Sequence, residues 1–430
     1  MLTTAHRELL ADPGFRRLWA ATSISELGSN VGRMAFILLV HELARASGDD
    51  PERDVALVML LETLPMLCLG PVAGAVVDRF DRRRLLIGCD IAAGLLLLAI
   101  PWLAALPTRA PLFAIAMVFS TISTVFHPAR QSAIPDLVPP DRLADANGLS
   151  TITSSVNLLL GTALGGFLIG AVGKNGCFVA DSAGFAVSIA FLMRLTLPRH
   201  NEPARHAGEL WGEVGKGLRY LARHRMLVYT TGNFFLTYCF VGAWYPVLPA
   251  FVEETLGGAP DVWVPLSLAC FGIGGGVGGV LAPRLARRLR LGRALLLLLL
   301  LLTVALPVYA LTGARYASLL LAAVGGTLIF ATMVLDTTLV HEEVPAGMRG
   351  RIFGTRAPMQ AAGILAGTSA VLSLAEGRAP QTLLAGASAA YAVLLLSSAA
   401  LHPGARALWR REEPPDDAEG SRRAAASATR

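Results

Sequence analysis

The chain has few charged residues for its length. Asp, Glu, Lys and Arg make up 16% of its 430 residues, and only two of them are lysines, Lys174 and Lys216. Soluble domains carry about 25% charged residues. Hydrophobic residues make up 54% of the chain, and apolar runs of about 20 residues recur along its whole length. This composition excludes an ordinary soluble domain and predicts an all-α integral membrane protein.

The residues that an enzyme or a metalloprotein needs are also missing. Five cysteines are scattered singly and do not have the spacing of a metal site. No Ser-His-Asp grouping is evident, and Gly274-Gly275-Gly276 lies in an apolar run without the Lys-Ser or Lys-Thr of a phosphate-binding loop. We therefore expect no enzyme activity, no metal and no cofactor. The net charge of +6 is spread over many loops, which argues against a nucleic-acid partner.

Twelve apolar segments have the length that spans a bilayer. We expect them at residues 18–43, 55–77, 85–105, 111–126, 148–172, 177–197, 226–252, 262–282, 294–311, 317–340, 354–375 and 380–402. They predict an N-terminal six-helix bundle (1–197), a cytoplasmic linker (198–225), a C-terminal six-helix bundle (226–403) and a disordered cytoplasmic tail (404–430). No cleavable signal peptide is evident before the first segment.

Basic residues alternate between the two sides of these segments. One set of loops, with both termini, carries 30 Lys and Arg residues, and the opposite loops carry six. Short loops rich in Lys and Arg stay in the cytoplasm. The asymmetry predicts a multi-pass protein of the inner membrane with both termini in the cytoplasm, in contact with the lipid bilayer.

The two halves of the sequence repeat each other. Gly74, Arg79 and the pair Arg82-Arg83 recur 205 residues later as Gly279, Arg284 and Arg287-Arg288. With an offset of 206, Pro139 and Gly148 recur as Pro345 and Gly354, and Gly161-Thr162 recurs as Gly367-Thr368. Repeated halves in a membrane protein are typical of transporters and predict two pseudo-symmetric bundles.

The motif Gly74-x-x-x-Asp78-Arg79-x-x-Arg82-Arg83 resembles the loop signature of the major facilitator superfamily. The run Phe126–Pro139 and the segment Arg349–Gly354 are similar to its bacterial drug, macrolide and siderophore exporters. The resemblance implies the major facilitator fold and an alternating-access transporter. The chain departs from the family pattern at Asp81, where glycine is usual, at Ser29, where relatives often carry an acid, and at Thr162, where antiporters carry proline. Residues 111–126 also lack the mid-membrane arginine of many drug/proton antiporters.

Ionisable groups inside a bilayer are costly and indicate function. Glu26 and Arg33 lie seven residues apart on one helix face, with Asn30 between them. We expect Glu26 to bind a proton or a cationic substrate with Arg33 as its charge partner; the alternative is a purely structural pair. Glu62 is a second candidate for coupling, or faces outside water. Asp336 is another, or caps a helix at the interface.

The basic loop predicts a second site, a cytoplasmic latch between the halves, formed by charge-assisted hydrogen bonds. Its expected members are Gly74, Asp78, Arg79, Arg82, Arg83 and Arg130, with Asp136 as a further candidate. The alternative is that the arginines only fix topology. Five residues are expected to line the substrate cavity: Asn30, Asn157, Asn233, Phe234 and Tyr238. Asp90 and Asp181 fall on helices that the family fold places outside the cavity, and we interpret both as structural groups bonded to neighbouring helices.

Together these features predict a monomeric secondary transporter that exports small amphipathic molecules, such as drugs or secondary metabolites, in exchange for protons. The absence of an ATP site means that a gradient supplies the energy. Two alternatives remain: a siderophore or lipid exporter or uniporter without proton coupling, and a membrane sensor that transports nothing.

Overall fold

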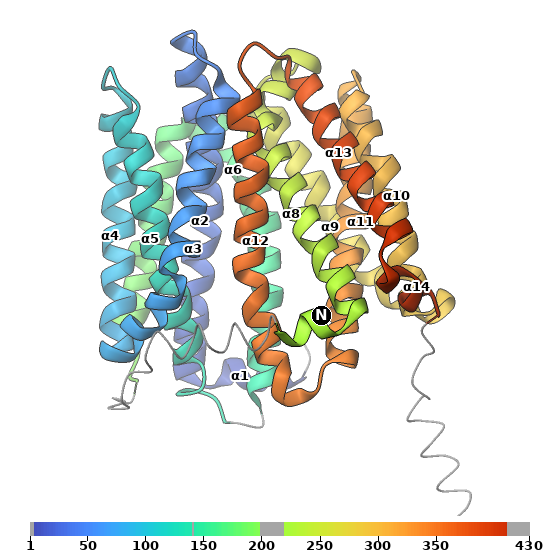
Figure 1. Cartoon of the computed structure of the whole chain (residues 1–430). Helices are drawn as coiled ribbons and strands as arrows, with labels where there is room; N and C mark the ends of the chain where they lie inside the picture. The colour runs from blue at the N-terminus through green and yellow to red at the C-terminus, as the bar shows by residue number, and fades with distance from the viewer. Residues whose placement is uncertain (1–3, 140–141, 198–218, 411–430) are drawn as a thin grey trace, which may run out of the picture.

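The computed structural model describes residues 4–139, 142–197 and 219–410, apart from some side chains within helices (Figure 1). These residues form helices, turns and short connections and no strand. The first half contains α1 (Thr4–Ala11), α2 (Pro13–Ala46), α3 (Pro51–Arg79), α4 (Arg82–Ala104), α5 (Ala110–Ala133) and α6 (Leu143–Met193). The second half contains α8 (Arg225–Ala250), which continues into the π-helix η2 (Phe251–Thr255), then α9 (Pro260–Leu289), α10 (Leu291–Leu311), α11 (Arg315–Glu343), α12 (Ala346–Leu374), α13 (Pro380–Leu401) and α14 (Pro403–Arg410).

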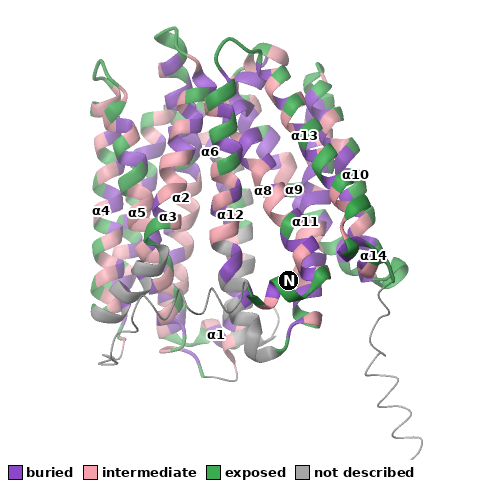
Figure 2. Cartoon of the chain, in the orientation of Figure 1, coloured by how far each residue is buried: buried purple, intermediate pink, exposed green. Residues whose placement is uncertain are grey.

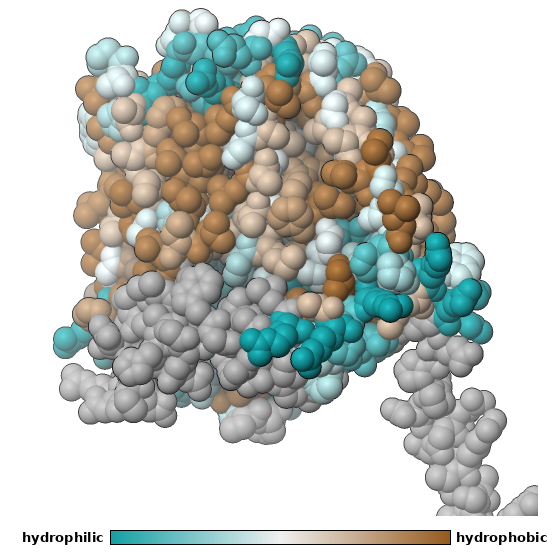
Figure 3. Space-filling view, in the orientation of Figure 1, coloured by the Kyte–Doolittle hydropathy of each residue, from teal (hydrophilic) through white to brown (hydrophobic). Residues whose placement is uncertain are grey.

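The fold class predicted from the sequence is confirmed. Within the described residues eight helices are long and apolar enough to cross a membrane, and Pro358–Leu374 is a shorter apolar helix. A broad hydrophobic band crosses the middle of the face shown in Figure 3. The predicted spans 18–43 and 55–77 lie in α2 and α3. Both segments are helical throughout, but neither is counted among the eight helices. In α2 the reason is its charged residues, which include Glu26 and Arg33.

Helix α6 contains two of the predicted spans, separated by one residue. Gly173 has φ 73° and ψ 173°, which breaks the helical path between the spans 148–172 and 177–197. Glycine adopts positive φ without the steric penalty that a Cβ brings. The chain therefore turns back across the bundle at Gly173, and Lys174 lies at this turn.

Asp81 has a local role that explains its departure from the family pattern. It is the N-cap of α4, and its Oδ1 accepts a hydrogen bond from the backbone N–H of Arg84 at 2.9 Å. Such a cap stabilises a helix by about 1 kcal/mol because it satisfies an otherwise unpaired N–H. A glycine at this position could not supply that acceptor.

The helices differ in how far they are enclosed (Figure 2). In the most apolar window of α8, 67% of the residues are buried, against 17% in α5 and 22% in α13. Helix α8 thus lies inside the bundle. Between the halves, α3 packs on α12 and α6 packs on α9.

Glycines allow some helix pairs to approach closely. A Cβ built on Gly274 of α9 would lie 1.9 Å from the carbonyl oxygen of Ala323 on α11, and one on Gly326 would lie 1.9 Å from that of Phe271. A Cβ on Gly276 or Gly279 would meet nothing within 4 Å. Only part of the glycine run in α9 therefore serves helix packing.

The contact between α8 and α12 gives a testable prediction. A Cβ on Gly367 would lie 1.9 Å from the carbonyl oxygen of Cys239, so Gly367→Ala must push α12 away from α8. We expect it to lower the free energy of unfolding by about 1–3 kcal/mol, the usual cost of overpacking. Gly276→Ala is the matched control, and we expect it to be neutral or slightly stabilising because its surroundings are open. Thermal unfolding in detergent measures both variants; equal losses would contradict the packing argument.

The predicted tail begins as a helix, which corrects the boundary drawn from the sequence. Residues 404–410 belong to α14, where Ala405 and Leu408 are buried, and Gly404 lies against α8, since its Cβ would be 2.2 Å from the carbonyl oxygen of Arg225. These packed residues were expected to be disordered because small residues and arginines dominate the segment. Residues 411–430 and most of the predicted linker, 198–218, lie outside the described residues.

Candidate functional site

Two ends of the bundle serve as reference points. The Lys174 end carries the connections at residues 47–50, 105–109 and 375–379, drawn at the top of Figure 1. The Arg82 end carries α1 and α14, drawn at the bottom. The charged groups of the interior lie between these ends and at them.

Glu26 on α2 lies where three helices meet. Its Oε2 accepts a hydrogen bond of 3.0 Å from Ser154 Oγ on α6 and lies 3.5 Å from Arg130 Nη1 on α5. The side chains of Glu26 and Arg130 keep 25% and 13% of their surface exposed. A carboxylate held by one cation and one hydroxyl can exchange its partner for a proton or a cationic substrate.

Neighbouring bonds hold α2 against α6 around this carboxylate. Trp19 Nε1 donates to Thr153 Oγ1 at 2.9 Å, and Asn157 Nδ2 donates to the backbone oxygen of Ser23 at 3.0 Å. Asn157 is buried and fastens two helices, while Asn30 donates to the backbone oxygen of Glu26 in its own helix. The structure does not place Asn30 or Asn157 in a cavity among the described residues, so their expected contact with substrate stays a prediction.

Arg33 belongs to a separate cluster, so its expected pairing with Glu26 is wrong. Arg33 Nη2 lies 2.9 Å from Glu62 Oε2 on α3, and its guanidinium lies 5.6 Å from the centre of the Tyr245 ring on α8. Seven helical residues place Glu26 and Arg33 about 10 Å apart along α2, beyond the reach of a direct pair. Because α8 belongs to the second half, this cluster connects the two bundles.

Asp336 on α11 forms a buried ion pair with an arginine on α12. Arg356 Nη1 on α12 lies 2.6 Å from Asp336 Oδ2, and the side chains are only 8% and 6% exposed. The guanidinium of Arg356 also lies 5.1 Å from the centre of the Phe234 ring on α8. Asp336 is therefore a core residue of the second half, and the alternative of an interfacial cap is wrong.

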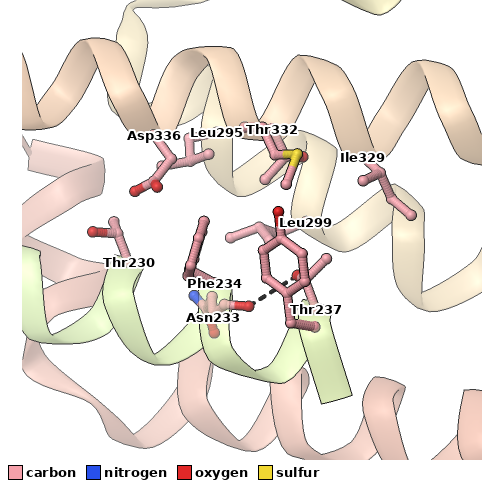
Figure 4. Close-up of a pocket in the computed structure, with 11 residues that line it drawn as sticks. Thr230, Asn233, Phe234, Thr237, Leu295, Leu299, Ile329, Thr332 and Asp336 are labelled. Carbon is pink, nitrogen blue, oxygen red and sulfur yellow. Dashed lines mark hydrogen bonds between the residues drawn. The ribbon is translucent and has the colours of Figure 1, made fainter. Parts of the chain in front are cut away.

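A cavity adjoins this pair between α8, α10 and α11 (Figure 4). Three of the residues expected to contact substrate line it: Asn233, Phe234 and Tyr238. The carboxylate of Asp336 projects from α11 toward Thr230 and Phe234 on α8 (Figure 4). The remaining lining residues are mainly apolar or carry hydroxyl groups: Thr237, Leu295, Leu299, Ile329, Thr332 and Met333. Such a lining suits an amphipathic molecule.

The two interior ion pairs occupy related places in the repeat. Arg130 and Asp336 are separated by 206 residues, the same offset that relates Gly161 to Gly367. Arg130 on α5 reaches α2, whereas Asp336 on α11 reaches α12, and the charges are of opposite sign. Each of the two repeated positions thus forms an ion pair, but the partner residues lie on helices that are not equivalent in the repeat.

The predicted latch is only partly described. Arg82 Nη1 lies 2.6 Å from Asp136 Oδ2, and Arg83 Nε donates to the backbone oxygen of Leu192 at 2.9 Å. These bonds join parts of the first half and do not cross to the second. Arg130 is not part of this cluster, because it pairs with Glu26. The side chains of Gly74, Asp78 and Arg79 lie outside the described residues, so their part in a latch stays a prediction.

Ion pairs between the halves gather at the Lys174 end, as far as both partners are described. Glu253 of η2 pairs with His41 Nε2 at 2.9 Å and with Arg45 Nε at 2.8 Å, both on α2. Arg45 Nη1 also lies 3.0 Å from Glu254 Oε1. Lys174 Nζ lies 2.7 Å from Glu42 Oε2 and 2.9 Å from Asp261 Oδ2 on α9. These pairs hold the Lys174 end closed.

We expect Glu253→Gln to open this end. The variant loses the charge that attracts Arg45, and this partly exposed ion pair contributes up to about 1 kcal/mol. It also weakens the hydrogen bond between Glu253 and the buried imidazole of His41. Since 1.4 kcal/mol changes a population tenfold, the open form should rise several-fold to about tenfold. Spin labels at the exposed positions Ser47 and Ala259, in a cysteine-free background, measure the separation of the two halves. Glu254→Gln, which removes only one contact, should shift less; equal distance distributions in all three proteins would contradict the closure.

The sequence analysis predicts Arg130 only as a latch residue and does not single out Arg356. Arg130 was counted in a loop because the predicted helix ended at Phe126, before Pro128; α5 instead continues through Pro128 to Ala133. Arg130 therefore lies in the last turn of α5, near the Arg82 end and not in the middle of the span. Arg356 was counted with the basic residues of the Arg82 end, although it fell inside the predicted span 354–375. An arginine within a predicted span was the signal that could have identified it.

Comparison with solved structures identifies the fold. The fold matches a bacterial homolog of the human lysosomal transporter Spinster with a TM-score of 0.68 and 14% identity, over 93% of this chain and 98% of the other. It also matches a bacterial homologue of the iron transporter ferroportin with a TM-score of 0.67 and 15% identity, over 89% and 98% of the two chains. At these identities the likeness shows the fold alone. The family model and the curated relatives described next show that the chain is a membrane transporter of the major facilitator type and not an enzyme.

A family model described as a transmembrane secretion effector matches residues 7–413, and the chain belongs to this family. Macrolide efflux protein A of Streptococcus pyogenes is 24% identical over 62% of this chain and 65% of its own length. The multidrug efflux pump Tap of Mycobacterium bovis is 26% identical over 80% and 82%. An uncharacterized MFS-type transporter of Bacillus subtilis, YkuC, is 27% identical over 59% and 60%. The chain spans about half to two thirds of the length of the first curated relatives it matches.

Proposed function

We propose that this transporter exports small amphipathic compounds by alternating access in exchange for protons. The observation that carries the proposal is Glu26, a carboxylate inside the helical bundle that contacts α5 through Arg130 and α6 through Ser154. Relatives named for macrolide and multidrug efflux support export and an amphipathic substrate. The apolar cavity beside Asp336 supports the same substrate class.

The coupling follows from competition for Glu26. When Glu26 is ionised, Arg130 and Ser154 neutralise and solvate its carboxylate. When a proton binds, the carboxyl becomes neutral, and the attraction to Arg130 is lost. Arg130 is then free to repel a cationic substrate, while the ionised form attracts one. Protons entering from outside and substrate leaving the cell therefore occupy the same site at different times.

The conformation also fits this cycle. The ion pairs around Glu253 and Lys174 close the Lys174 end, and we assign that end to the outside of the inner membrane. The Arg82 end, with both termini, then faces the cytoplasm, in agreement with the distribution of basic residues. Two solved structures of the same fold are described as inward-facing. We infer that this conformation is the inward-facing one and that the monomer carries out the cycle.

Purified protein in liposomes tests the proposal. An imposed pH gradient should drive transport of an amphipathic dye such as ethidium, and a pH-sensitive dye inside the vesicles should report protons moving in the opposite direction. Dye transport without proton movement would replace antiport by uncoupled transport. Absence of flux of any probe, including a macrolide and a lipid analogue, would contradict the export function.

A further inference from the structure

Asp181 is a buried carboxyl group that the proposed cycle leaves without a role. It lies on the second part of α6 and is 1% exposed. Neither carboxyl oxygen has a hydrogen-bond partner among the described residues, and no ion pair joins it there. The sequence reading expected it to bond to a neighbouring helix. The structure places it against that helix without such a bond, so the expectation is wrong.

The neighbouring helix offers only bare backbone to this carboxyl. A Cβ built on Gly28 of α2 would lie 2.6 Å from Asp181 Oδ1, and one on Gly32 would lie 2.2 Å from Asp181 Oδ2. These two glycines, four residues apart, share one face of α2. Together they leave the space on α2 in which the Asp181 carboxyl lies. A side chain larger than that of glycine at either position would occupy this space.

Asp90 is the natural comparison, since it is equally buried and packs against α6, the helix that carries Asp181. It lies on α4, is 1% exposed, and its Oδ2 accepts a hydrogen bond of 2.6 Å from Ser188 Oγ on α6. The sequence interpretation of Asp90 as a structural group agrees with this bond. Asp181 differs because it lacks even this single donor.

The other titratable groups around Asp181 are engaged elsewhere. On α2, Glu26 pairs with Arg130 and Arg33 pairs with Glu62. On α4, Asp90 accepts from Ser188. On its own helix, Cys177 lies one turn earlier and carries a neutral thiol. No described cation is therefore placed to compensate a negative charge on Asp181.

We propose that Asp181 is a second proton-binding site, which holds a proton while Gly28 and Gly32 pack on it and releases the proton to water when this contact opens. An isolated carboxylate inside a protein in a membrane is very costly, so the group is neutral in this conformation. Its release step breaks the carboxyl O–H bond and transfers the proton to a water molecule that enters between α2 and α6. Binding is the reverse reaction.

Helix α2 links this site to the transport cycle, and this link rests on the proposed function. Gly28 lies two residues after Glu26, which places the two on opposite faces of α2, about 200° apart. A movement of α2 that changes the contacts of Glu26 with Arg130 and Ser154 therefore also moves the glycine face across Asp181. Eight residues separate Asp181 from the turn at Gly173, or about 12 Å of helix, against about 18 Å to Met193 at the Arg82 end. The shorter path leads to the Lys174 end.

Infrared spectroscopy of the full chain in detergent tests the protonation. Wild-type protein near neutral pH should show a protonated-carboxyl band that Asp181→Asn removes and Glu26→Gln leaves in place. Asp90→Asn is the matched control, and it should leave the band that Asp181→Asn removes in place. Asparagine has nearly the shape of a protonated aspartic acid, so the variant should fold. A spectrum of Asp181→Asn identical to that of wild type would overturn the proposal.

Proton counting in liposomes tests the coupling. Asp181→Asn should move about one proton fewer per substrate molecule than wild type, with substrate binding retained. An unchanged proton count would overturn the role of Asp181 in transport, whatever its protonation. Failure of the proposed function is distinguishable, because wild-type protein would then show no proton-coupled flux while the infrared band of Asp181 remained. Gly28→Ala supplies a second variant, since its Cβ displaces the carboxyl and should shift or abolish the same band.

Discussion

The Asp336→Asn variant is expected to be the least stable single substitution considered for this protein. It removes the negative partner of Arg356 at 2.6 Å, where both side chains are less than a tenth exposed. Removing one partner of a buried ion pair costs about 3–5 kcal/mol in stability, because the buried guanidinium of Arg356 loses the carboxylate that neutralises it. Thermal unfolding in detergent should therefore show a marked drop in the unfolding temperature.

Two control variants test whether the loss of stability comes from the buried position of this ion pair, because the removal of an ion pair at the surface should cost much less. The double variant Asp336→Asn/Arg356→Gln leaves no buried charge and should recover a large part of the lost stability. Arg142→Gln removes an exposed pair with Glu8, whose side chains are 41% and 52% exposed, and should cost at most about 1 kcal/mol. If Asp336→Asn unfolded at the temperature of Arg142→Gln, the description of Asp336 and Arg356 as a buried pair would be wrong.

The Glu26→Gln variant is expected to lose proton-coupled export. Glutamine keeps the shape of glutamate and can still accept the hydrogen bond from Ser154, but it neither binds a proton nor attracts Arg130. Without a titratable group at position 26, proton binding at this site can no longer couple the pH gradient to export. We expect pH-driven export to fall by at least a hundredfold, while equilibrium binding of a neutral substrate changes little.

The matched control for this experiment is Glu8→Gln, an exposed carboxyl at the Arg82 end that should leave transport unchanged. Efflux and proton movement are followed in the same vesicles. Normal pH dependence of export by Glu26→Gln would exclude Glu26 as the coupling residue. Loss of neutral-substrate binding together with coupling would instead indicate that Glu26 stabilises the structure of the binding site.

Composition and apolar run lengths were enough to predict an all-α membrane protein, because both report directly on burial in lipid. The duplication was visible because repeated turns require the same glycines and arginines in each half. Pairings between helices were harder to predict. Arg33 was matched to Glu26 on its own helix, yet its partner is Glu62 on α3, brought near by packing that no local pattern records.

Two further differences have local physical causes. The sequence predicts a fourth span at residues 111–126, but α5 continues through Pro128 to Ala133, and this places Arg130 beside Glu26. Asp181 was expected to have a bonding partner, since most buried polar groups do. The bare glycine face that α2 presents to it depends on the rotation of that helix in the bundle, which sequence spacing alone does not determine.

The accessibility of Glu26 from each side of the membrane tests the central claim most directly. A membrane-impermeant carbodiimide, applied to one side of oriented vesicles, labels carboxyl groups that it can reach, and mass spectrometry locates the label. Wild-type protein should be labelled at Glu26 from the Arg82 side, and Glu253→Gln should be labelled from the Lys174 side at an increased rate. Alternating access to this carboxylate would be contradicted if Glu26 were labelled from neither side. It would also be contradicted if Glu253→Gln left the labelling rate from the Lys174 side unchanged.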